Sequence, residues 1–475
     1  MNLRETAPPL SSSAARLPLF GRIAGTWSWS AMGLLWLIYA MNTNMRQWFS
    51  LVQPSLVQEF HLTPAAMGLY TGLLTMSVGV SGVALSPWLD RGGHGWARKY
   101  RHLPIALCYF AFSVLSGINA LSASFALLFC FQLAKNLASG IGEASEVTAV
   151  AEWWPLERRG FAQGLHHTAF PWGSLLGGLA VSAVFAVFGS QNWRYVFLIL
   201  PWLLLPTLFV FWRFSTAERY AAFNADTRRR GLTPPLLEDV DGNALHAAPG
   251  AFGRAIANPN ILVSSIVSGL ANFSLYGISF WLPLYLAFVA HYSLAKVATL
   301  SVLFTITGGI GQILWGSISD RLGRKYSLVL MFIWLTVAFL LFRFAGSSLA
   351  ALVAVQLFAG LATNGVYPVL YALASDSSER GAVGIANGLN MGGVVLGGFG
   401  TIVVGEIIEL GGGYASDAGF QLSLYFLAGT MAVAAVMIAL LTRETAGRFI
   451  HLDRALVSRE SCHRGAFIPT HRPID

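Results

Sequence analysis

Four ionisable residues lie inside long apolar segments, where a charge is costly. Arg46 lies in one such segment, and Lys135, Glu143 and Glu146 lie in another. A charged side chain at the centre of a bilayer costs about 2.5–3.5 kcal/mol on insertion scales, so such residues mark substrate or proton paths. On a helix Lys135 and Glu146 face nearly the same direction, and Glu143 lies about 80° away on the same side. We therefore expect these side chains to face a polar path through the protein.

Each of these residues suits a particular step in moving an anion together with a proton. Arg46 is expected to bind a substrate carboxylate, assisted by Lys135; the alternative is that its guanidinium extends to the outer interface. Glu143 is the first candidate for the proton and Glu146 the second, although Glu146 equally suits an ion-pair layer near the cytoplasm. Lys135 has a structural alternative as the partner of either glutamate. The imidazole of His166 is a further proton candidate, and a hydrogen bond between helices is its alternative use.

Uncharged polar residues in the apolar segments are expected to form the rest of the path. Asn42 and Asn44 precede Arg46 in the same segment. In the second half, two pairs of polar residues lie four positions apart, so each pair shares one helix face. Hydrogen bonding between helices is the alternative use of such residues. Pro368 follows Tyr367 and is expected to kink the tenth span. The candidate substrate-binding residues of the second half are Asn272, Tyr276, Asn364, Tyr367, Tyr371 and Asn390.

The composition and the apolar segments predict an all-α membrane protein. The chain has 475 residues, of which 55% are hydrophobic and 11% charged, whereas soluble proteins carry about 25% charged residues. This composition argues against a soluble enzyme, a nucleic-acid-binding protein and a disordered protein. Twelve apolar segments are long enough to cross a bilayer as helices, in which every backbone group finds a partner. They are residues 27–47, 66–88, 103–121, 125–152, 160–188, 193–213, 260–289, 296–318, 326–344, 348–374, 381–409 and 420–442.

The basic residues predict the orientation of these helices. An even number of spans places both termini on one side, and most of the 30 lysine and arginine residues lie on that side. Basic residues concentrate in cytoplasmic loops. The protein is therefore expected in a bacterial inner (plasma) membrane with both termini on the cytoplasmic side. The net charge of +8 then needs no nucleic acid to explain it. The predicted regions are a cytoplasmic tail (1–22), a six-helix bundle (23–213), a cytoplasmic central loop (214–257), a second six-helix bundle (258–443) and a cytoplasmic C-terminal tail (444–475).

Two sequence patterns recur in the two halves. Residues 160–166 read Gly-Phe-Ala-Gln-Gly-Leu-His and residues 384–390 read Gly-Ile-Ala-Asn-Gly-Leu-Asn, so Gly, Ala, Gly and Leu recur in register. The Ser-Pro-Trp-Leu-Asp-Arg stretch at 86–91 is echoed by Gly-Ser-Ile-Ser-Asp-Arg at 316–321. Two pseudo-symmetric bundles around a central path are typical of secondary transporters, whose substrate site lies between the bundles.

The second of these patterns carries a resemblance to a known family. Residues 316–325 resemble the signature loop of the major facilitator superfamily, Gly-x-x-x-Asp-Arg-x-Gly-Arg-Lys, and residues 192–197 resemble another of its hallmarks. In the first copy of the loop Ser86 replaces the first glycine, and residues 92–97 lengthen the gap before the next basic pair. The resemblance covers roughly residues 23–445 and implies a transporter with a charged latch at the cytoplasmic face. The alternative is that these charges only set topology. The gate residues that it implies are Asp90, Arg91, Arg98, Lys99, Asp320, Arg321, Arg324 and Lys325.

A finer resemblance concerns the anion:cation symporters, a branch that moves organic anions with protons. Residues 39–46, Tyr-Ala-Met-Asn-Thr-Asn-Met-Arg, resemble its first span, in which an Asn-Tyr-x-Asp-Arg-like motif supplies an arginine for the carboxylate. Arg46 matches that arginine, and Met45 stands where the acid would be. Residues 140–144 resemble the branch's Gly-x-x-Glu, with Glu143 on its glutamate.

The sequence therefore predicts proton-coupled uptake of a small organic anion, such as a sugar acid or another carboxylate, by alternating access. The alternatives are a proton-coupled drug or metabolite exporter and a non-transporting sensor on the same fold. The expected partners are the substrate, protons and the lipid bilayer, and the protein is expected to work as a monomer. No nucleic acid, metal, cofactor or enzymatic activity is expected. The sequence has no Gly-x-x-x-x-Gly-Lys-Ser/Thr loop, so its energy source is not expected to be ATP.

Overall fold

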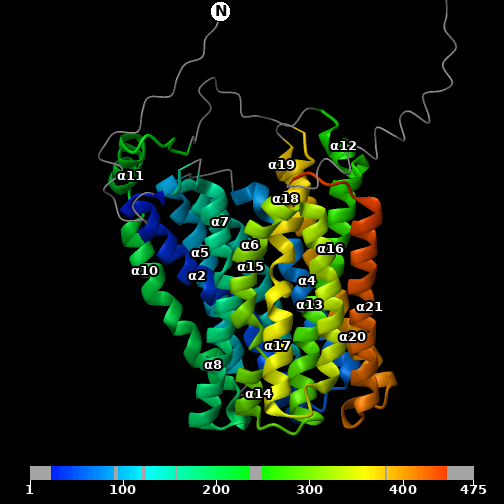
Figure 1. The fold of residues 1–475 in the computed structure, drawn as a ribbon. Helices are drawn as coiled ribbons and strands as arrows, with labels where there is room; N and C mark the ends of the chain where they lie inside the picture. Colours follow the sequence, from blue (N-terminus) through cyan, green and yellow to red (C-terminus); the bar gives the residue numbers. More distant parts are fainter. Residues whose placement is uncertain are drawn as a thin grey trace, which may run out of the picture.

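The chain forms a bundle of long helices that lie roughly parallel to one axis (Figure 1). The computed structural model describes residues 23–89, 95–119, 125–155, 158–235, 249–379 and 382–446, and the secondary structure of these residues is helical. Among them, ten helical segments are long and apolar enough to cross a membrane. Two further helices of 26 residues each, α2 and α4, complete the twelve. The prediction of an all-α protein with twelve transmembrane helices is confirmed.

The first six spans come from the first half of the chain. Short helices connect some of them: α3 (Gln53–Phe60), η2 (Gly95–Arg98) and η5 (Ser190–Asn192). The spans are α2 (Thr26–Leu51), α4 (Pro64–Leu89), α5 (Lys99–Asn119), α6 (Phe125–Glu152), α7 (Arg159–His167) with α8 (Ala169–Phe188), and α9 (Arg194–Ile199) with η6 (Leu200–Leu203) and α10 (Leu204–Phe214).

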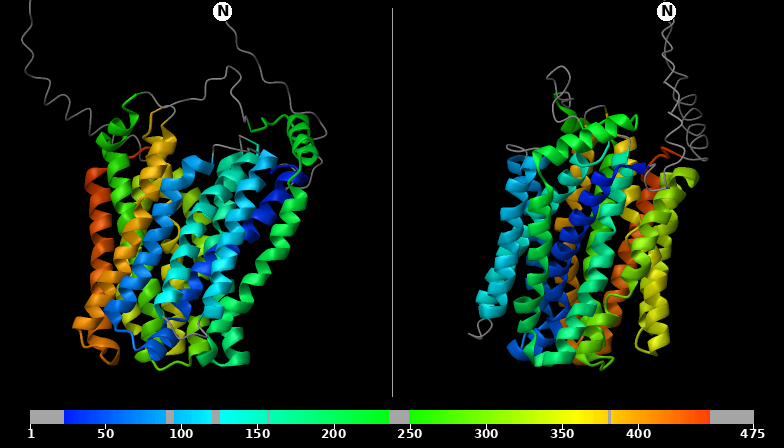
Figure 2. Two further views of the ribbon diagram at one scale, coloured as in Figure 1. Left: turned by 180° about the vertical axis from the view of Figure 1, so that it is seen from behind. Right: turned by 90° about the vertical axis from the view of Figure 1, so that its left-hand side faces the viewer.

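The second half supplies the other six spans. They are α13 (Pro259–Phe288), α14 (Leu294–Leu300) with α15 (Phe304–Leu322), α16 (Arg324–Leu341) with η7 (Phe342–Phe344), α17 (Leu349–Thr363) with α18 (Val366–Asp376), α19 (Val383–Met391) with α20 (Gly393–Leu410), and α21 (Asp417–Leu441). Between the halves, α11 (Ala217–Arg229) and α12 (Ala251–Ala257) lie at the same end of the molecule (Figures 1 and 2). We call this the α11/α12 end, and the opposite one the α3/α14 end.

Breaks within two spans follow the internal repeat. The span that begins with the 160–166 pattern is interrupted at Thr168. The span that begins with the 384–390 pattern is interrupted at Gly392. These two positions are equivalent when the patterns are aligned. A third break, at Asn364 and Gly365, precedes Pro368, whose ring nitrogen cannot donate to the carbonyl four residues earlier. The kink expected from this proline is therefore present one turn before it.

The two bundles are fastened together at the α3/α14 end. Here α4 packs along α20, and α8 packs against α14 and α15. Three hydrogen bonds cross the boundary: Thr401 Oγ1 to the Gly68 carbonyl (3.0 Å), Ser182 Oγ to the Ala295 carbonyl (2.8 Å) and the Ala65 amide to Glu409 Oε2 (3.2 Å). A Cβ atom on Gly72 would lie 2.6 Å from the Gly398 carbonyl oxygen, so glycine permits the close approach of α4 and α20.

Candidate functional site

Polar side chains of α2 and α6 face one another along much of their length. Residues three positions apart on α2 meet residues about four apart on α6, because the helices run in opposite directions. Tyr39 Oη donates to Glu143 Oε1 (2.9 Å), Asn42 Nδ2 to the Ser139 carbonyl (3.2 Å), and Lys135 Nζ to the Met45 carbonyl (2.6 Å). We call this row the α2–α6 seam; it consists of Tyr39, Asn42, Met45, Arg46, Lys135, Ser139, Glu143 and Glu146.

The predicted substrate and proton residues form an ion pair in this seam. Arg46 Nη1 lies 2.8 Å from Glu143 Oε2. The two side chains are 12% and 20% exposed, so the pair is reachable, unlike most of the seam. The long guanidinium arm points back toward the N-terminus of α2, as helical side chains do, which lets it reach Glu143 beside Tyr39. The pairing neutralises both charges within the membrane.

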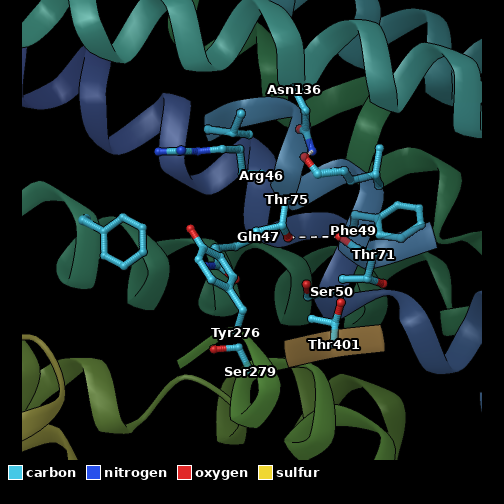
Figure 3. Close-up of a pocket in the computed structure, with 13 residues that line it drawn as sticks. Arg46, Gln47, Phe49, Ser50, Thr71, Thr75, Asn136, Tyr276, Ser279 and Thr401 are labelled. Atoms are coloured by element: carbon cyan, nitrogen blue, oxygen red, sulfur yellow. Dashed lines mark hydrogen bonds between the residues drawn. The ribbon is translucent and has the colours of Figure 1, made fainter. Parts of the chain in front are cut away.

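Two adjoining cavities lie between the bundles, and Figure 3 shows the first of them, beside Arg46. Both are lined by Gln47, Ser50, Phe170, Tyr276 and Ser279. Arg46 supplies the charge in the lining of the first cavity, as far as the structure describes it. The first cavity is also lined by Arg46, Phe49, Thr71, Leu74, Thr75, Val78, Asn136 and Thr401, and the second by Leu51, Ser174, Leu275, Pro283, Ser301, Val302, Phe304 and Thr305. One guanidinium surrounded by hydroxyls, amides and aromatic rings can hold a small hydroxylated anion.

Two tyrosines of the second bundle interact with the ion pair, and a third lies beside them. Tyr276 of α13 interacts electrostatically with Arg46 and Glu143, and Tyr371 of α18 with Glu143. Tyr367 interacts with the other two tyrosines, and its hydroxyl is buried without a hydrogen-bond partner among the described residues. The tyrosines predicted for the path thus lie near one another, and the hydroxyl of Tyr367 is available to donate a hydrogen bond to a ligand.

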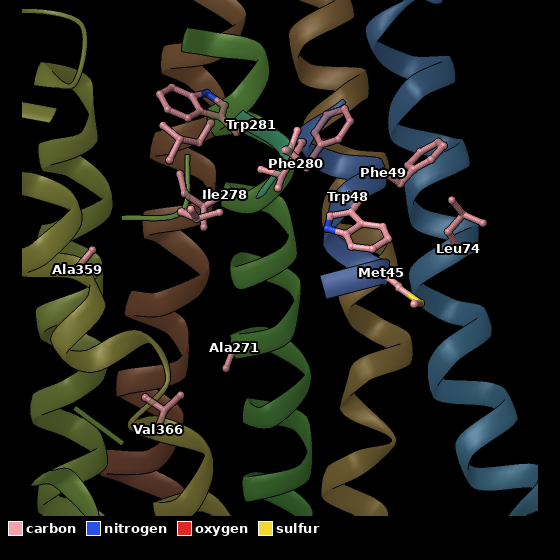
Figure 4. Close-up of a cluster of buried hydrophobic side chains, with 14 of the residues drawn as sticks. Met45, Trp48, Phe49, Leu74, Ala271, Ile278, Phe280, Trp281, Ala359 and Val366 are labelled. Carbon is pink, nitrogen blue, oxygen red and sulfur yellow. The ribbon is translucent and has the colours of Figure 1, made fainter. Parts of the chain in front are cut away.

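Apolar side chains follow the cavity toward the α3/α14 end. Figure 4 shows Trp48 and Phe49 on α2, with Phe280 and Trp281 on α13. Trp48 and Phe280 are 1% and 0% exposed. The indole of Trp281 donates to the Phe420 carbonyl (2.9 Å), which fixes the ring against α21. Buried aromatic side chains thus pack beside the cavity, and Phe49 is part of its lining.

Several predicted binding residues use their polar groups within one bundle. Lys135 is fully buried and also donates to Gln132 Oε1 (2.5 Å). Asn272 Nδ2 donates to the Ser268 carbonyl (2.9 Å). Asn390 Oδ1 accepts hydrogen bonds from the hydroxyls of Ser264 and Ser265, and Asn390 Nδ2 donates to the Leu370 carbonyl. These side chains have partners that hold helices together.

The two remaining asparagines lie where helices meet at glycines. Asn44 of α2 is buried against Gly177 of α8, and Asn364 lies next to Gly308 of α15. The Asn364 amide nitrogen has no hydrogen-bond partner within the described part of the chain. Pro171 of α8 is also near Gly308, so Asn364 stands where the two bundles approach each other.

The other two candidate proton carriers are buried inside the first bundle. Glu146 and His166 are both 0% exposed. Glu146 Oε1 accepts from Asn42 Nδ2 (3.4 Å), and the His166 ring stacks on Tyr39 with centroids 4.6 Å apart. Among these three candidates, Glu143 is the one that is partly exposed and paired with an arginine that lines the first cavity.

Equivalent ion pairs occupy the α11/α12 end of both bundles. Arg98 Nε and Nη2 donate to the two Glu152 oxygens, each at 2.7 Å, and the Gly95 amide also donates to Glu152 (2.9 Å). In the second bundle Arg324 lies 2.6 Å from Asp320 and 3.3 Å from Asp376. Arg98 and Arg324 therefore both pair with carboxylates of their own bundle.

The remaining predicted gate residues are placed differently. Lys99 Nζ donates to the Ser215 carbonyl (2.6 Å) and lies 5.3 Å from the Tyr100 ring centre. Arg321 is exposed and Lys325 is half-buried. Asp90 and Arg91 lie outside the described residues.

Some functional-site residues were missed by the sequence analysis. Glu444, which the prediction placed in the C-terminal tail, is 7% exposed and accepts from the Arg324 amide (2.7 Å) and the Tyr326 amide (3.4 Å). It thus caps the first turn of α16, where a carboxylate is favoured. Gly323 has φ +118° and packs directly on this carboxylate, so it needs to be glycine. In the cavity, Ser50 lies one turn after Arg46, a spacing that would have identified it.

Comparison with known proteins agrees with this architecture. A sequence model of the Major Facilitator Superfamily matches residues 35–308 and 290–455. The probable sulfoacetate transporter SauU of Cupriavidus necator is 25% identical over 86% of this chain and 93% of its own length. The gallate transporter of Pseudomonas putida is 25% identical over 82% of this chain and 88% of its own.

Other relatives and a solved structure extend the comparison. The glucose-6-phosphate exchanger SLC37A2 of Xenopus tropicalis is 27% identical over 50% of this chain, which spans about half (52%) of that relative. A bacterial homolog of the human lysosomal transporter Spinster, in an inward-facing and unoccupied conformation, has a TM-score of 0.66 at 17% identity and covers 92% of this chain. The chain therefore belongs to the Major Facilitator Superfamily.

Proposed function

We propose that the protein takes up a small organic anion together with protons by alternating access. The observation that carries this proposal is the Arg46–Glu143 pair (2.8 Å), whose arginine lines a polar cavity between the two bundles. A guanidinium in this position binds carboxylate or sulfonate groups through parallel hydrogen bonds.

The same pair provides a route for coupling. A substrate anion that binds Arg46 competes with Glu143 for the guanidinium. A carboxylate left without its partner inside the membrane is costly, so the displaced Glu143 is neutralised by a proton. Substrate and proton then favour each other's binding, and this coupling is reciprocal.

The charge of the cavity favours a substrate with a single negative group. Arg46 is the cation in the described lining, since Lys135 is fully buried and bonded to the Met45 carbonyl and Gln132. A phosphate ester carries nearly two charges and would call for a second cation. The tyrosines and hydroxyls around Arg46 suit a hydroxylated carboxylate. The resemblance to the gallate transporter over most of both chains points in the same direction, because gallate has one carboxylate.

The proposed orientation places the α11/α12 end in the cytoplasm of a bacterial inner membrane, with both termini on that side. Basic residues at this end include Arg98, Lys99, Arg324 and Lys325, as the positive-inside rule requires of a cytoplasmic face. The fastened α3/α14 end would then face outward, and the structure would represent an inward-facing state.

Transport by purified protein in sealed vesicles tests the proposal. Gallate, sulfoacetate and glucose 6-phosphate are offered outside, with and without an acid-outside pH gradient. Gradient-driven accumulation of gallate is expected to exceed that of sulfoacetate and glucose 6-phosphate, each of which carries about two negative charges near neutral pH. Preferential uptake of glucose 6-phosphate would contradict the monoanion assignment. Proton-driven movement in the opposite sense would instead identify an exporter, and binding without movement would identify a sensor.

A further inference from the structure

A second polar cluster lies inside the first bundle, apart from the cavity. It consists of Asn42 on α2, His102 and Tyr109 on α5, and Glu146 on α6, all 0% exposed. His102 Nε2 lies 4.0 Å from Glu146 Oε1, and the Tyr109 hydroxyl is beside the same carboxyl group. The ring of Phe211 from α10 packs against the imidazole of His102 in a T-shaped arrangement, with ring centroids 5.8 Å apart. We call these four residues the His–Glu cluster.

The surrounding charges are already paired. Arg98 on η2 is bonded to Glu152, and Arg46 on α2 is bonded to Glu143. His166 on α7 also interacts electrostatically with His102. In the described part of the chain His102 is the basic group within 4.0 Å of Glu146.

The imidazole has hydrogen-bonding capacity that the fold does not use. Both ring nitrogens of His102 are buried without a hydrogen-bond partner among the described residues. A buried polar group without a partner calls for an explanation such as a functional role. A titratable pair in this condition, three residues along α6 from Glu143, suits proton transfer.

We propose that His102 and Glu146 form a proton relay between Glu143 and the α11/α12 end of the first bundle. The inference rests on the proton coupling proposed above and adds where the proton is held. His102 lies one turn from the start of α5 at that end, and Glu146 lies one turn from Glu143 on α6.

The relay conserves atoms and charge. With one proton the pair is neutral, either as imidazole and carboxylic acid or as imidazolium and carboxylate. When the substrate leaves and Arg46 pairs with Glu143 again, the proton of Glu143 passes toward the α11/α12 end. The O–H bond of Glu146, which accepts from Asn42, breaks and an N–H bond forms on His102 Nε2, so the pair becomes imidazolium and carboxylate. A 4.0 Å separation exceeds a hydrogen bond, so this step requires the ring to move toward the carboxyl group. The O–H bond of Glu143 then breaks as an O–H bond forms on Glu146, and the imidazolium releases its Nδ1 proton to water at the α11/α12 end, which restores the neutral pair.

Transport assays distinguish a proton relay from a cluster that only stabilises the fold. Glu146→Gln and His102→Gln are compared with the matched control His167→Gln, whose Nδ1 contacts the Gln163 carbonyl (2.8 Å) near the cavity. Both relay variants should keep counterflow exchange of gallate or sulfoacetate but lose proton-driven accumulation by about tenfold or more. The control should lose neither.

Infrared spectra of the purified proteins in lipid give a readout that needs no substrate. A carboxylic acid absorbs apart from a carboxylate, so the wild type should show an acid band that titrates with pH. Glu146→Gln should lack this band, and His102→Gln should change the pH at which it disappears, whereas His167→Gln should not. A band that persists in Glu146→Gln, or equal titration in both histidine variants, would overturn the relay. If the wild type transports neither probe while the band behaves as expected, the substrate proposal fails and the relay stands.

Discussion

Arg98 and Arg324 are equivalent residues of the two bundles, and each forms an ion pair with a carboxylate at the end of a neighbouring span. Arg98 holds Glu152 at 2.7 Å, and Arg324 lies 3.3 Å from Asp376. The first pair is nearly buried, with side chains 2% and 7% exposed, whereas the second is 15% and 36% exposed. The first pair therefore suits a permanent fastening within its bundle. The second, which also contacts Asp320, is more easily exchanged during a conformational change.

This difference predicts unequal effects on stability. Glu152→Gln leaves Arg98 buried with a broken pair, so it should destabilise the protein by about 3–5 kcal/mol. Asp376→Asn affects an exposed pair and should cost about 1 kcal/mol or less. Thermal unfolding of both variants in detergent measures the comparison. Similar melting temperatures for the two variants would show that burial does not separate the two pairs.

Arg46 is expected to be essential for anion binding. Arg46→Ala should abolish binding of gallate or sulfoacetate while leaving the amount of folded protein unchanged. Arg46→Lys should restore little, because the parallel hydrogen bonds of the guanidinium are lost. Calorimetry with the anion and with a neutral amide analogue checks the charge dependence. Normal binding by Arg46→Ala would mean that this guanidinium serves the membrane interface.

Glu143 is expected to couple substrate to protons. Glu143→Gln mimics the protonated carboxyl, so substrate binding and counterflow exchange should persist while accumulation driven by a pH gradient is lost. Vesicle assays with equal and unequal pH on the two sides measure both properties. Accumulation at the wild-type level would remove Glu143 from the coupling scheme.

Lys135 is expected to act through the position of α2. Its ammonium holds the Met45 carbonyl next to Arg46 (2.6 Å). Lys135→Ala leaves buried acceptors without a donor, so it should lower stability by about 1–3 kcal/mol. At a temperature where the variant is folded, anion affinity should fall much less than in Arg46→Ala. An equal loss of affinity at unchanged stability would instead indicate direct contact with the anion.

The orientation can be tested with cysteines in exposed loops. Ser347 follows η7 at the α3/α14 end, and Gly231 follows α11 at the other end. An impermeant thiol reagent added to intact cells should label Ser347→Cys and spare Gly231→Cys until the membrane is opened. Cys108 and Cys130 are replaced first, because both are exposed on the protein surface. Labelling of the Gly231 position in sealed cells would reverse the proposed topology.

The sequence alone determined the helices and the charges that they carry. Apolar length located the spans, and Pro368 indicated the break in the tenth span, because helix formation in lipid depends on local composition and backbone hydrogen bonding. Arg46 and Glu143 were identified for the same reason, since a charge in an apolar segment is conspicuous wherever the helix packs.

The partners of those charges depended on tertiary packing. Helical periodicity gives the face of a side chain but not the helix that covers this face. Periodicity grouped Lys135, Glu143 and Glu146 on one side of α6. The packing of α2 then pairs Lys135 with the Met45 carbonyl and Glu143 with Arg46, and the packing of α5 places Glu146 near His102. His102 itself lies near the start of its span, where a polar residue is unremarkable in sequence, and its burial comes from helices distant along the chain.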